Sequence, residues 1–148
     1  RGATNFSTTR SWERRPLNLD ISSNMKPPVE NVKVSSKGRD ILIQAKRHTG
    51  LRQWNELLRW AFCLSLANPM KPKFTAKMDT GLEPIEWSTF AGPLSDHFAA
   101  TFAWRAAQDE VDLADRAALG DYFRAHIERG VTSLRTLKSL ESLVGQVS

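Results

Sequence analysis

The chain has 148 residues, a formal net charge of +5 and a pI near 9.7, a balance that favours a polyanionic partner. Its 41% hydrophobic and 25% charged residues are typical of a globular domain, and the longest strongly apolar run, residues 60–64, is too short to span a bilayer. A single cysteine, Cys63, excludes an internal disulfide and a thiolate metal cage, so we expect a cytoplasmic protein.

The first 24 residues lack hydrophobic periodicity and are rich in Ser, Thr, Asn and Arg. Met25 stands directly before the first predicted element, so we expect residues 1–24 to be a flexible segment or an addition upstream of the natural start. An ordered arm that contacts DNA or another subunit is the alternative. Pro27 and Pro28 then favour an extended spacer.

Residues 31–50 predict a short strand followed by a helix. Val32 and Val34 alternate with polar residues, a pattern typical of a strand with one buried face and one polar face. Ser36 is a suitable N-cap for a helix that begins near Lys37, because its hydroxyl can accept a hydrogen bond from a free amide of the first turn.

A glycine turn and a second helix complete this unit. Thr49-Gly50 ends the first helix, because glycine adopts the left-handed C′ conformation at little cost. A longer and more apolar helix is predicted from about Arg52 to Ala67. The order of strand, helix, turn and helix over 31–69 is that of a ribbon-helix-helix unit, in which two chains pair their strands into one ribbon that lies in the DNA major groove. An ordinary strand and helix hairpin with a basic face explains the same pattern.

The second half of the chain predicts further helices. Residues 70–92 predict a loop, in which the sequence IEWSTFAG forms a short strand or an irregular packed stretch. Three helices are predicted to follow, over residues 93–108, 113–129 and 132–144. Asp112 is the predicted N-cap of the middle helix and Gly130 its end. The predicted fold class is therefore mainly α, with a ribbon-helix-helix-like N-terminal unit followed by a helical C-terminal half.

Charge is distributed unevenly along the chain. Residues 31–59 carry seven basic and two acidic residues, a net charge of +5, whereas residues 79–128 carry three arginines and ten acidic residues, a net charge of −7. Such polarity suits a protein that places one face on nucleic acid and the other toward a protein partner.

The basic residues predict phosphate contacts in the first half. Lysine and arginine neutralise phosphates, while hydroxyl groups and free helix amides add hydrogen bonds. We expect these contacts from the polar face of the strand, the first turn of the helix and the residues that flank the glycine turn. The candidate DNA-binding residues are Lys33, Ser35, Lys37, Arg39, Lys46, Arg47 and Arg52. Few of them can read base edges, so we predict recognition of DNA shape rather than of sequence.

Catalytic signatures are missing from the sequence. There is no glycine-rich phosphate loop, HExxH, GxSxG or cysteine pair. The three histidines do not have the spacing of helical metal ligands, and His126 is predicted to pack against Tyr122 and Phe123. We therefore expect no catalytic residue, no metal and no cofactor, and a protein that is not an enzyme.

Several short motifs stand together in one order. The first half carries a hydrophobic-Ser start, a basic helix that ends in Thr-Gly, an Asn-containing helix and a closing Ser-Leu pair. These are Val34-Ser35, Lys46/Arg47, Thr49-Gly50, Asn55 and Ser65-Leu66. Together with TFAG (residues 89–92) and DYFRAHIERGV (residues 121–131), they resemble both halves of the DndE family of the DNA phosphorothioation system, over about residues 33–134.

This resemblance implies a non-catalytic, self-associating helical protein, such as a tetramer, that binds double-stranded DNA and prefers nicked DNA. It would act beside the sulfur-transfer protein DndC and the ATPase DndD, where a non-bridging phosphate oxygen of DNA is replaced by sulfur. The resemblance assigns DNA contacts to Lys46 and Arg47, with Lys37 and Arg39 as further candidates, and subunit packing to Thr49 and Gly50. It also implies a single DndE-like domain over 25–148, composed of the 31–69 unit, a loop over 70–92 and helices over 93–148.

Two other functions fit the residues. A ribbon-helix-helix transcriptional repressor would read a specific operator through Asn31, Lys33 and Ser35 on the strand. A protein scaffold would dock a partner on the acidic half and leave the basic half in solvent.

Overall fold

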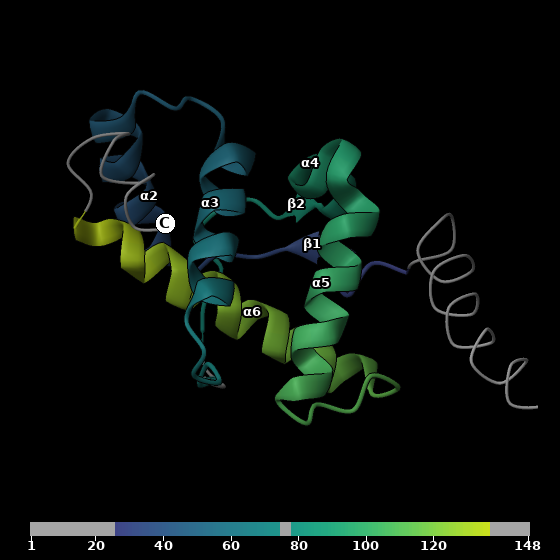
Figure 1. Cartoon of the computed structure of the whole chain (residues 1–148). Helices are drawn as coiled ribbons and strands as arrows, with labels where there is room; N and C mark the ends of the chain where they lie inside the picture. Colours follow the sequence, from purple (N-terminus) through teal and green to yellow (C-terminus); the bar gives the residue numbers. More distant parts are fainter. Residues whose placement is uncertain (1–25, 75–77, 137–148) are drawn as a thin grey trace, which may run out of the picture.

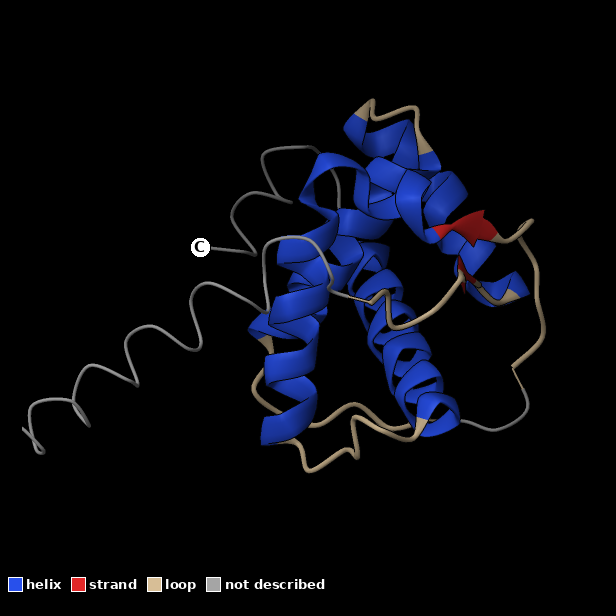
Figure 2. Cartoon of the chain, turned by 90° about the vertical axis from the view of Figure 1, so that its right-hand side faces the viewer, coloured by secondary structure: helices blue, strands red, loops and turns tan. Residues whose placement is uncertain are grey.

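The computed structural model describes residues 26–74 and 78–136, and it is mainly helical with one short two-stranded sheet at an edge (Figures 1 and 2). The elements in chain order are β1 (Asn31–Val32), α2 (Ser36–Thr49), α3 (Trp54–Ala67), β2 (Ile85–Glu86), α4 (Trp87–Ala91), the 3₁₀ helix η1 (Gly92–Leu94), α5 (Ser95–Gln108), α6 (Arg116–Ser133) and the 3₁₀ helix η2 (Leu134–Thr136). The predicted mainly α class and the order of strand, helix, glycine turn and helix are confirmed. No helix in the described ranges is long and apolar enough to cross a membrane.

Helix α6 runs along one side of the molecule and contacts α2, α3 and α5 (Figure 1). The core centres on Phe62 of α3, which is fully buried. Its ring centroid lies 5.3–6.1 Å from those of four phenylalanines on α4, α5 and α6, and two of these contacts are edge-to-face. They are Phe90, Phe98, Phe102 and Phe123. This aromatic cluster joins the two halves of the chain in one core.

The sheet forms within a single chain. β1 pairs with β2 in antiparallel register, with Asn31 opposite Glu86 and Val32 opposite Ile85. This corrects the expectation of a ribbon made by two chains. β2 confirms the strand alternative for the start of IEWSTFAG, whereas helix α4 in the same stretch was not predicted. β1 is shorter than predicted because the chain after Val32 turns into the cap of α2.

The N-caps of α2 and α6 lie one and three residues away from their predicted positions. Ser35, not Ser36, is the N-cap of α2, since its Oγ accepts a hydrogen bond from the Gly38 amide at 3.0 Å. Helix α6 begins after Asp115, whose carboxylate caps the Ala118 amide at 3.1 Å, whereas the predicted cap Asp112 closes only a local turn before it.

The predicted end of α2 is confirmed and that of α6 is wrong. Gly50 caps α2 in the left-handed region at φ 77°, and its amide donates to the Lys46 carbonyl. Gly130 instead lies inside α6, where a side chain would collide with the backbone of Ala61 on α3. The predicted last helix is described only as far as η2, and residues 137–144 and 1–24 lie outside the described ranges.

Candidate nucleic-acid interface

Helix α2 has a buried face and a basic outer face. The buried residues recur at one-turn spacing and are Gly38, Ile41, Leu42 and Ala45. At about 100° per residue, Arg39, Lys46 and Arg47 fall within one sector on the other side of the helix. Arg39 and Arg47 are exposed, and Lys46 is half-buried. We call these three residues the basic face of α2; exposed Asp40 is the acidic residue beside it.

The turn after α2 fixes one of these cations. The Lys46 ammonium lies 3.8 Å from the ring centroid of Trp54, the first residue of α3. A cation–π contact of this kind restrains the lysine while leaving its charge in place. Thr49 closes the turn, because its hydroxyl donates to the Ala45 carbonyl and accepts from the Leu51 amide. The turn thus couples the basic face to the start of α3.

The cations of this surface form no ion pair within 4.0 Å with a carboxylate of the described residues. Arg105–Asp109 is the one ion pair within 4.0 Å that the described residues form. The basic face and exposed Arg52 in the following turn therefore keep a positive potential on this end of the molecule, in the part of the chain that the structure describes.

The structure separates the other predicted DNA-binding residues from this face. Ser35 is buried, and its hydroxyl donates to a Glu128 carboxylate oxygen at 2.7 Å, so the prediction that it lies on an exposed polar face is wrong. Lys37 is exposed on the opposite flank of α2, and Lys33 borders a separate groove beside α6.

The N-terminus of α2 is closed by carboxylates of the protein itself. Asp79 accepts from the Ser36 amide at 2.9 Å and from its hydroxyl at 2.5 Å, while Glu128 accepts from the Ser35 amide at 2.8 Å. The hydrogen bond from the Ser36 hydroxyl, together with that from its amide, lowers the pKa of Asp79. The Ser36 and Gly38 amides on either side of Lys37 therefore have acceptors within the protein, and two carboxylates lie at the helix end where phosphate contacts were predicted.

The short sequence motifs of the two halves pack against each other. The Asn55 side-chain amide donates to the Thr89 carbonyl at 3.2 Å, and Arg59 Nε donates to the Phe90 carbonyl at 2.6 Å. These bonds anchor α4 on α3, so the motifs first recognised as separate signals form one structural contact. A family model described as "DNA sulphur modification protein DndE" matches residues 31–142.

The chain belongs to the DndE family. The match covers well over half of the chain, which confirms the resemblance seen in the sequence and supports a role in DNA sulphur modification. Neither a curated protein nor a solved structure matches the chain.

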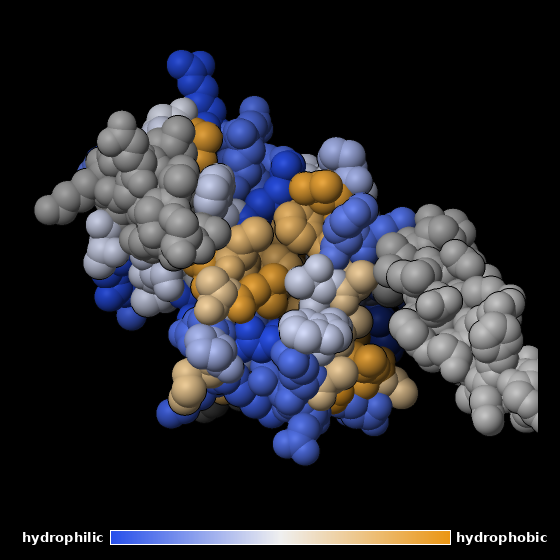
Figure 3. Space-filling view, viewed as in Figure 1, coloured by the Kyte–Doolittle hydropathy of each residue, from blue (hydrophilic) through white to orange (hydrophobic). Residues whose placement is uncertain are grey.

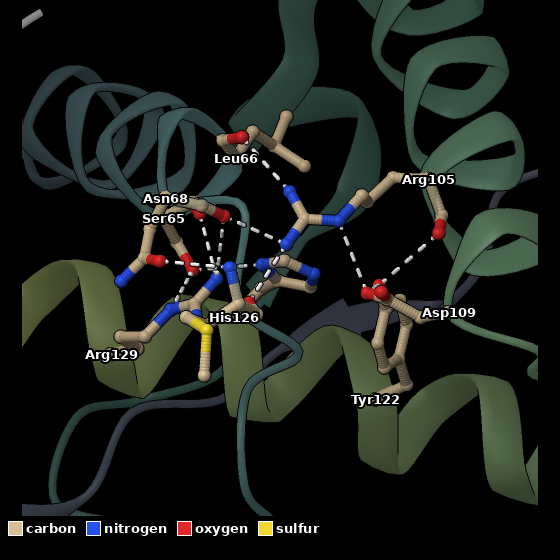
Figure 4. A network of polar contacts seen from close by, with 9 residues as sticks. Ser65, Leu66, Asn68, Arg105, Asp109, Tyr122, His126 and Arg129 are labelled. Atoms are coloured by element: carbon tan, nitrogen blue, oxygen red, sulfur yellow. Dashed lines mark hydrogen bonds and ion pairs between the residues drawn. The ribbon is translucent and has the colours of Figure 1, made fainter.

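This DndE-family protein also contains a buried polar network that sequence reasoning missed (Figure 4). Arg105 of α5 and Arg129 of α6 extend to the C-terminal end of α3. There they donate hydrogen bonds to backbone carbonyls of residues 65–70. Cations in this position complement the negative end of the helix dipole. Arg105 follows Phe102 by one turn on the apolar stripe of its helix, so its burial could be predicted, but its distant partners could not.

The network is structural rather than catalytic. The Ser65 hydroxyl lies 2.7 Å from His126 Nδ1, and the two residues are 1% and 0% exposed. A serine–histidine pair sealed in this way cannot meet a substrate. The prediction that His126 packs in the core is confirmed, and no group of three potential metal ligands occurs within residues 26–74 and 78–136.

Burial of His126 predicts a loss of stability in mild acid. Burial, reinforced by the positive charges of Arg129 and Arg105, lowers the pKa of His126 to about 3. Between pH 6.5 and 3 the unfolded chain therefore binds a proton that the folded chain does not, so the His126 contribution is constant above pH 6.5 and falls as the pH drops below it. We expect a loss of about 2 kcal/mol between pH 7.5 and 5, at about 1.4 kcal/mol per pH unit below 6.5.

Urea unfolding at both pH values measures this loss. The loss of unfolding free energy between pH 7.5 and 5 should be smaller in His126→Asn by most of the expected value of about 2 kcal/mol. It should be unchanged in His97→Gln, because His97 is exposed. An equal pH dependence in wild type and His126→Asn would contradict a neutral, buried His126.

Proposed function

We propose that this DndE-family protein is a non-catalytic accessory of DNA sulphur modification that binds double-stranded DNA through the basic face of α2 and Arg52. The main observation in support is that the exposed cations of this helix face and of the following turn lie together. None of them forms an ion pair with a carboxylate among the described residues. One of them, Lys46, is restrained over Trp54 and so loses less conformational freedom on binding a phosphate.

The spatial separation of charge supports this orientation. Helix α2 and the α5–α6 connector lie at opposite ends of the molecule (Figure 1). The connector carries four acidic residues, namely Asp109, Glu110, Asp112 and Asp115. An acidic end would be repelled by DNA, so DNA binding at α2 leaves it turned toward protein partners. We propose that these partners are DndC and DndD, and that the protein acts in the cytoplasm.

The remaining part of the proposal concerns assembly and DNA structure. We propose that the protein works as a homo-oligomer, such as a tetramer, with subunits that meet near Thr49 and exposed Gly50. Several copies would then present several basic faces to one duplex, which suits a preference for nicked or distorted DNA over a particular base sequence.

The repressor alternative fits the chain less well. A ribbon-helix-helix repressor needs a strand long enough to read bases, whereas β1 has two residues and is paired with β2 of its own chain. Ser35, one of its three expected base readers, is buried. The scaffold alternative is decided by whether DNA binds at all.

A fluorescence-anisotropy titration with intact and singly nicked duplexes of one sequence tests the proposal. We expect tighter binding to the nicked duplex, and binding to both that weakens steeply as salt rises. A strong preference for one palindromic sequence would favour the repressor, and no binding to either duplex would favour the scaffold.

A further inference from the structure

Lys33 lies in a groove of about 490 Å³ between the segment that leads into and past β1 and one side of α6. Its lining includes the cations Lys33, Arg116 and Arg124, the apolar Pro28 and Val29, and Gly120. Its volume lies in the range of about 300–1,000 Å³ that is usual for small-ligand sites. It is distinct from the basic face of α2, which contributes no residue to its lining.

Three cations meet in this groove from two elements. Arg116 and Arg124 are two turns apart on α6, with Gly120 between them, and Lys33 lines the same groove from the chain after β1. Because Gly120 has no side chain, the wall between the two arginines stays open; a Cβ there would come within 3.8 Å of Val29.

The two arginines are held in place by the backbone. Arg116 donates to the Pro27 carbonyl, and Arg124 donates to the Asp79 carbonyl. Each bond uses one guanidinium nitrogen and leaves other donors of the same group available. The Nε of Arg124 is buried and has no hydrogen-bond partner in the described part of the chain. A buried donor without a partner is costly, and either a water or a bound molecule can supply its acceptor.

The groove is not neutralised from within. Glu30 and Asp121 also line it, yet neither forms an ion pair within 4.0 Å with any residue in the described ranges. The three cations outnumber the two carboxylates. The arginine guanidinium presents a fork of donors that matches the oxygens of a phosphate, which lysine complements as a point charge.

We propose that this groove is a second binding site, for the phosphate of a nucleotide-sized ligand. The charged rim of Lys33, Arg116 and Arg124 would hold the phosphate, and the apolar side chains of Pro28 and Val29 would contact the rest of the molecule. The phosphate can belong to a DNA strand end or to a free nucleotide, since both present the same oxygens. The site does not rest on DNA binding at α2.

Isothermal titration calorimetry of the full chain with thymidine 5′-monophosphate and with thymidine tests this site. We expect the monophosphate to bind at least about tenfold more tightly than thymidine, the usual weight of hydrogen bonds to a charged group. Lys33→Gln and Arg116→Gln should each weaken monophosphate binding about tenfold, while Lys71→Gln, at an exposed lysine elsewhere, should leave it unchanged. Lys33 is exposed and forms no ion pair in the described structure, so its variant should fold normally.

Equal binding of thymidine and its monophosphate, or no binding of either at millimolar concentration, would overturn the proposal. So would monophosphate binding that is the same in Lys33→Gln and in wild type. Inorganic phosphate should compete in either case, because it presents the same oxygens. Competition by duplex DNA as well would assign the phosphate to a strand, and its absence would assign it to a free ligand; both support the site. If the monophosphate binds and duplex DNA does not, the proposed function of α2 fails and this site stands.

Discussion

Gly130→Ala is expected to lower the free energy of unfolding by about 3 kcal/mol or more, because α3 and α6 cross at this glycine. A Cβ at Gly130 would lie 1.8 Å from the carbonyl oxygen of Ala61 and 2.4 Å from its carbonyl carbon. The atoms that block it belong to the backbone of a buried helix, so they cannot turn away as a side chain could. Relief would require the two helices to separate, which would loosen the contact around Phe62. Urea unfolding followed by circular dichroism measures the loss.

Gly120→Ala is the matched control on the same helix. The nearest atom to a Cβ there is Val29 Cγ1 at 3.8 Å, an ordinary contact distance. Alanine should therefore stabilise α6 by about 0.5–1 kcal/mol, since it costs less conformational entropy than glycine inside a helix. Similar small effects of the two substitutions would show that the helices do not cross as closely as described here.

Arg105→Met is expected to cost about 3–5 kcal/mol, the usual penalty for removing one partner from a buried charged network. Arg105 is 6% exposed and donates to the carbonyls of Leu66, Asn68 and Met70 at 2.7–2.9 Å. It also pairs with Asp109 at 3.1 Å. Methionine fills a similar volume but removes four hydrogen bonds. The Met70 carbonyl keeps its bond from Arg129, and the Asp109 carboxylate keeps that from Tyr122.

Two further variants separate charge from geometry in this network. Arg105→Lys keeps the charge and loses the fork of donors, so its cost should fall between those of wild type and Arg105→Met. Arg135→Met removes an exposed arginine and should change stability by no more than about 0.5 kcal/mol. A loss below about 1 kcal/mol for Arg105→Met would contradict a role in closing the end of α3.

Local signals predicted the N-terminal helices well. The apolar spacing of Ile41, Leu42 and Ala45 defines the buried face of α2, and Gly50 ends it through its own backbone conformation. Both depend on residues close in sequence. The predicted start of α6 was wrong, because Asp112 is a residue type that favours N-caps but closes a turn before the helix, and Asp115 is the cap.

Contacts between distant residues could not be predicted. Gly130 resembles a helix end in sequence, and its real requirement is Ala61, which lies on another helix. The sequence does not show that β1 pairs with the short IEWSTFAG stretch, and Arg105 finds its carbonyl acceptors at and just beyond the end of α3. In each case the deciding group is at least thirty-five residues away along the chain, where periodicity carries no information.

The sequence predicted which residue types form the candidate site, but it predicted only part of their arrangement in space. The sequence identifies the basic residues of the first half, but the rotation of α2 places Lys37 on a different flank from Arg39 and Lys46. The N-cap role of Ser35 draws it into the structure, where Glu128 binds it. Lys33 falls beside α6 because the chain turns after β1. What remains together is the basic face of α2 and Arg52.

The salt dependence of duplex binding tests this assignment most directly. The affinity of wild type and of the Lys46→Gln/Arg47→Gln double variant would be measured by anisotropy on one intact duplex over a series of salt concentrations. Each lost phosphate contact should reduce the slope of log affinity against log salt by about 0.9, so the double variant should be shallower by about 1.8. Equal slopes for the two proteins, with the fold of the variant intact, would show that DNA binds elsewhere on the molecule.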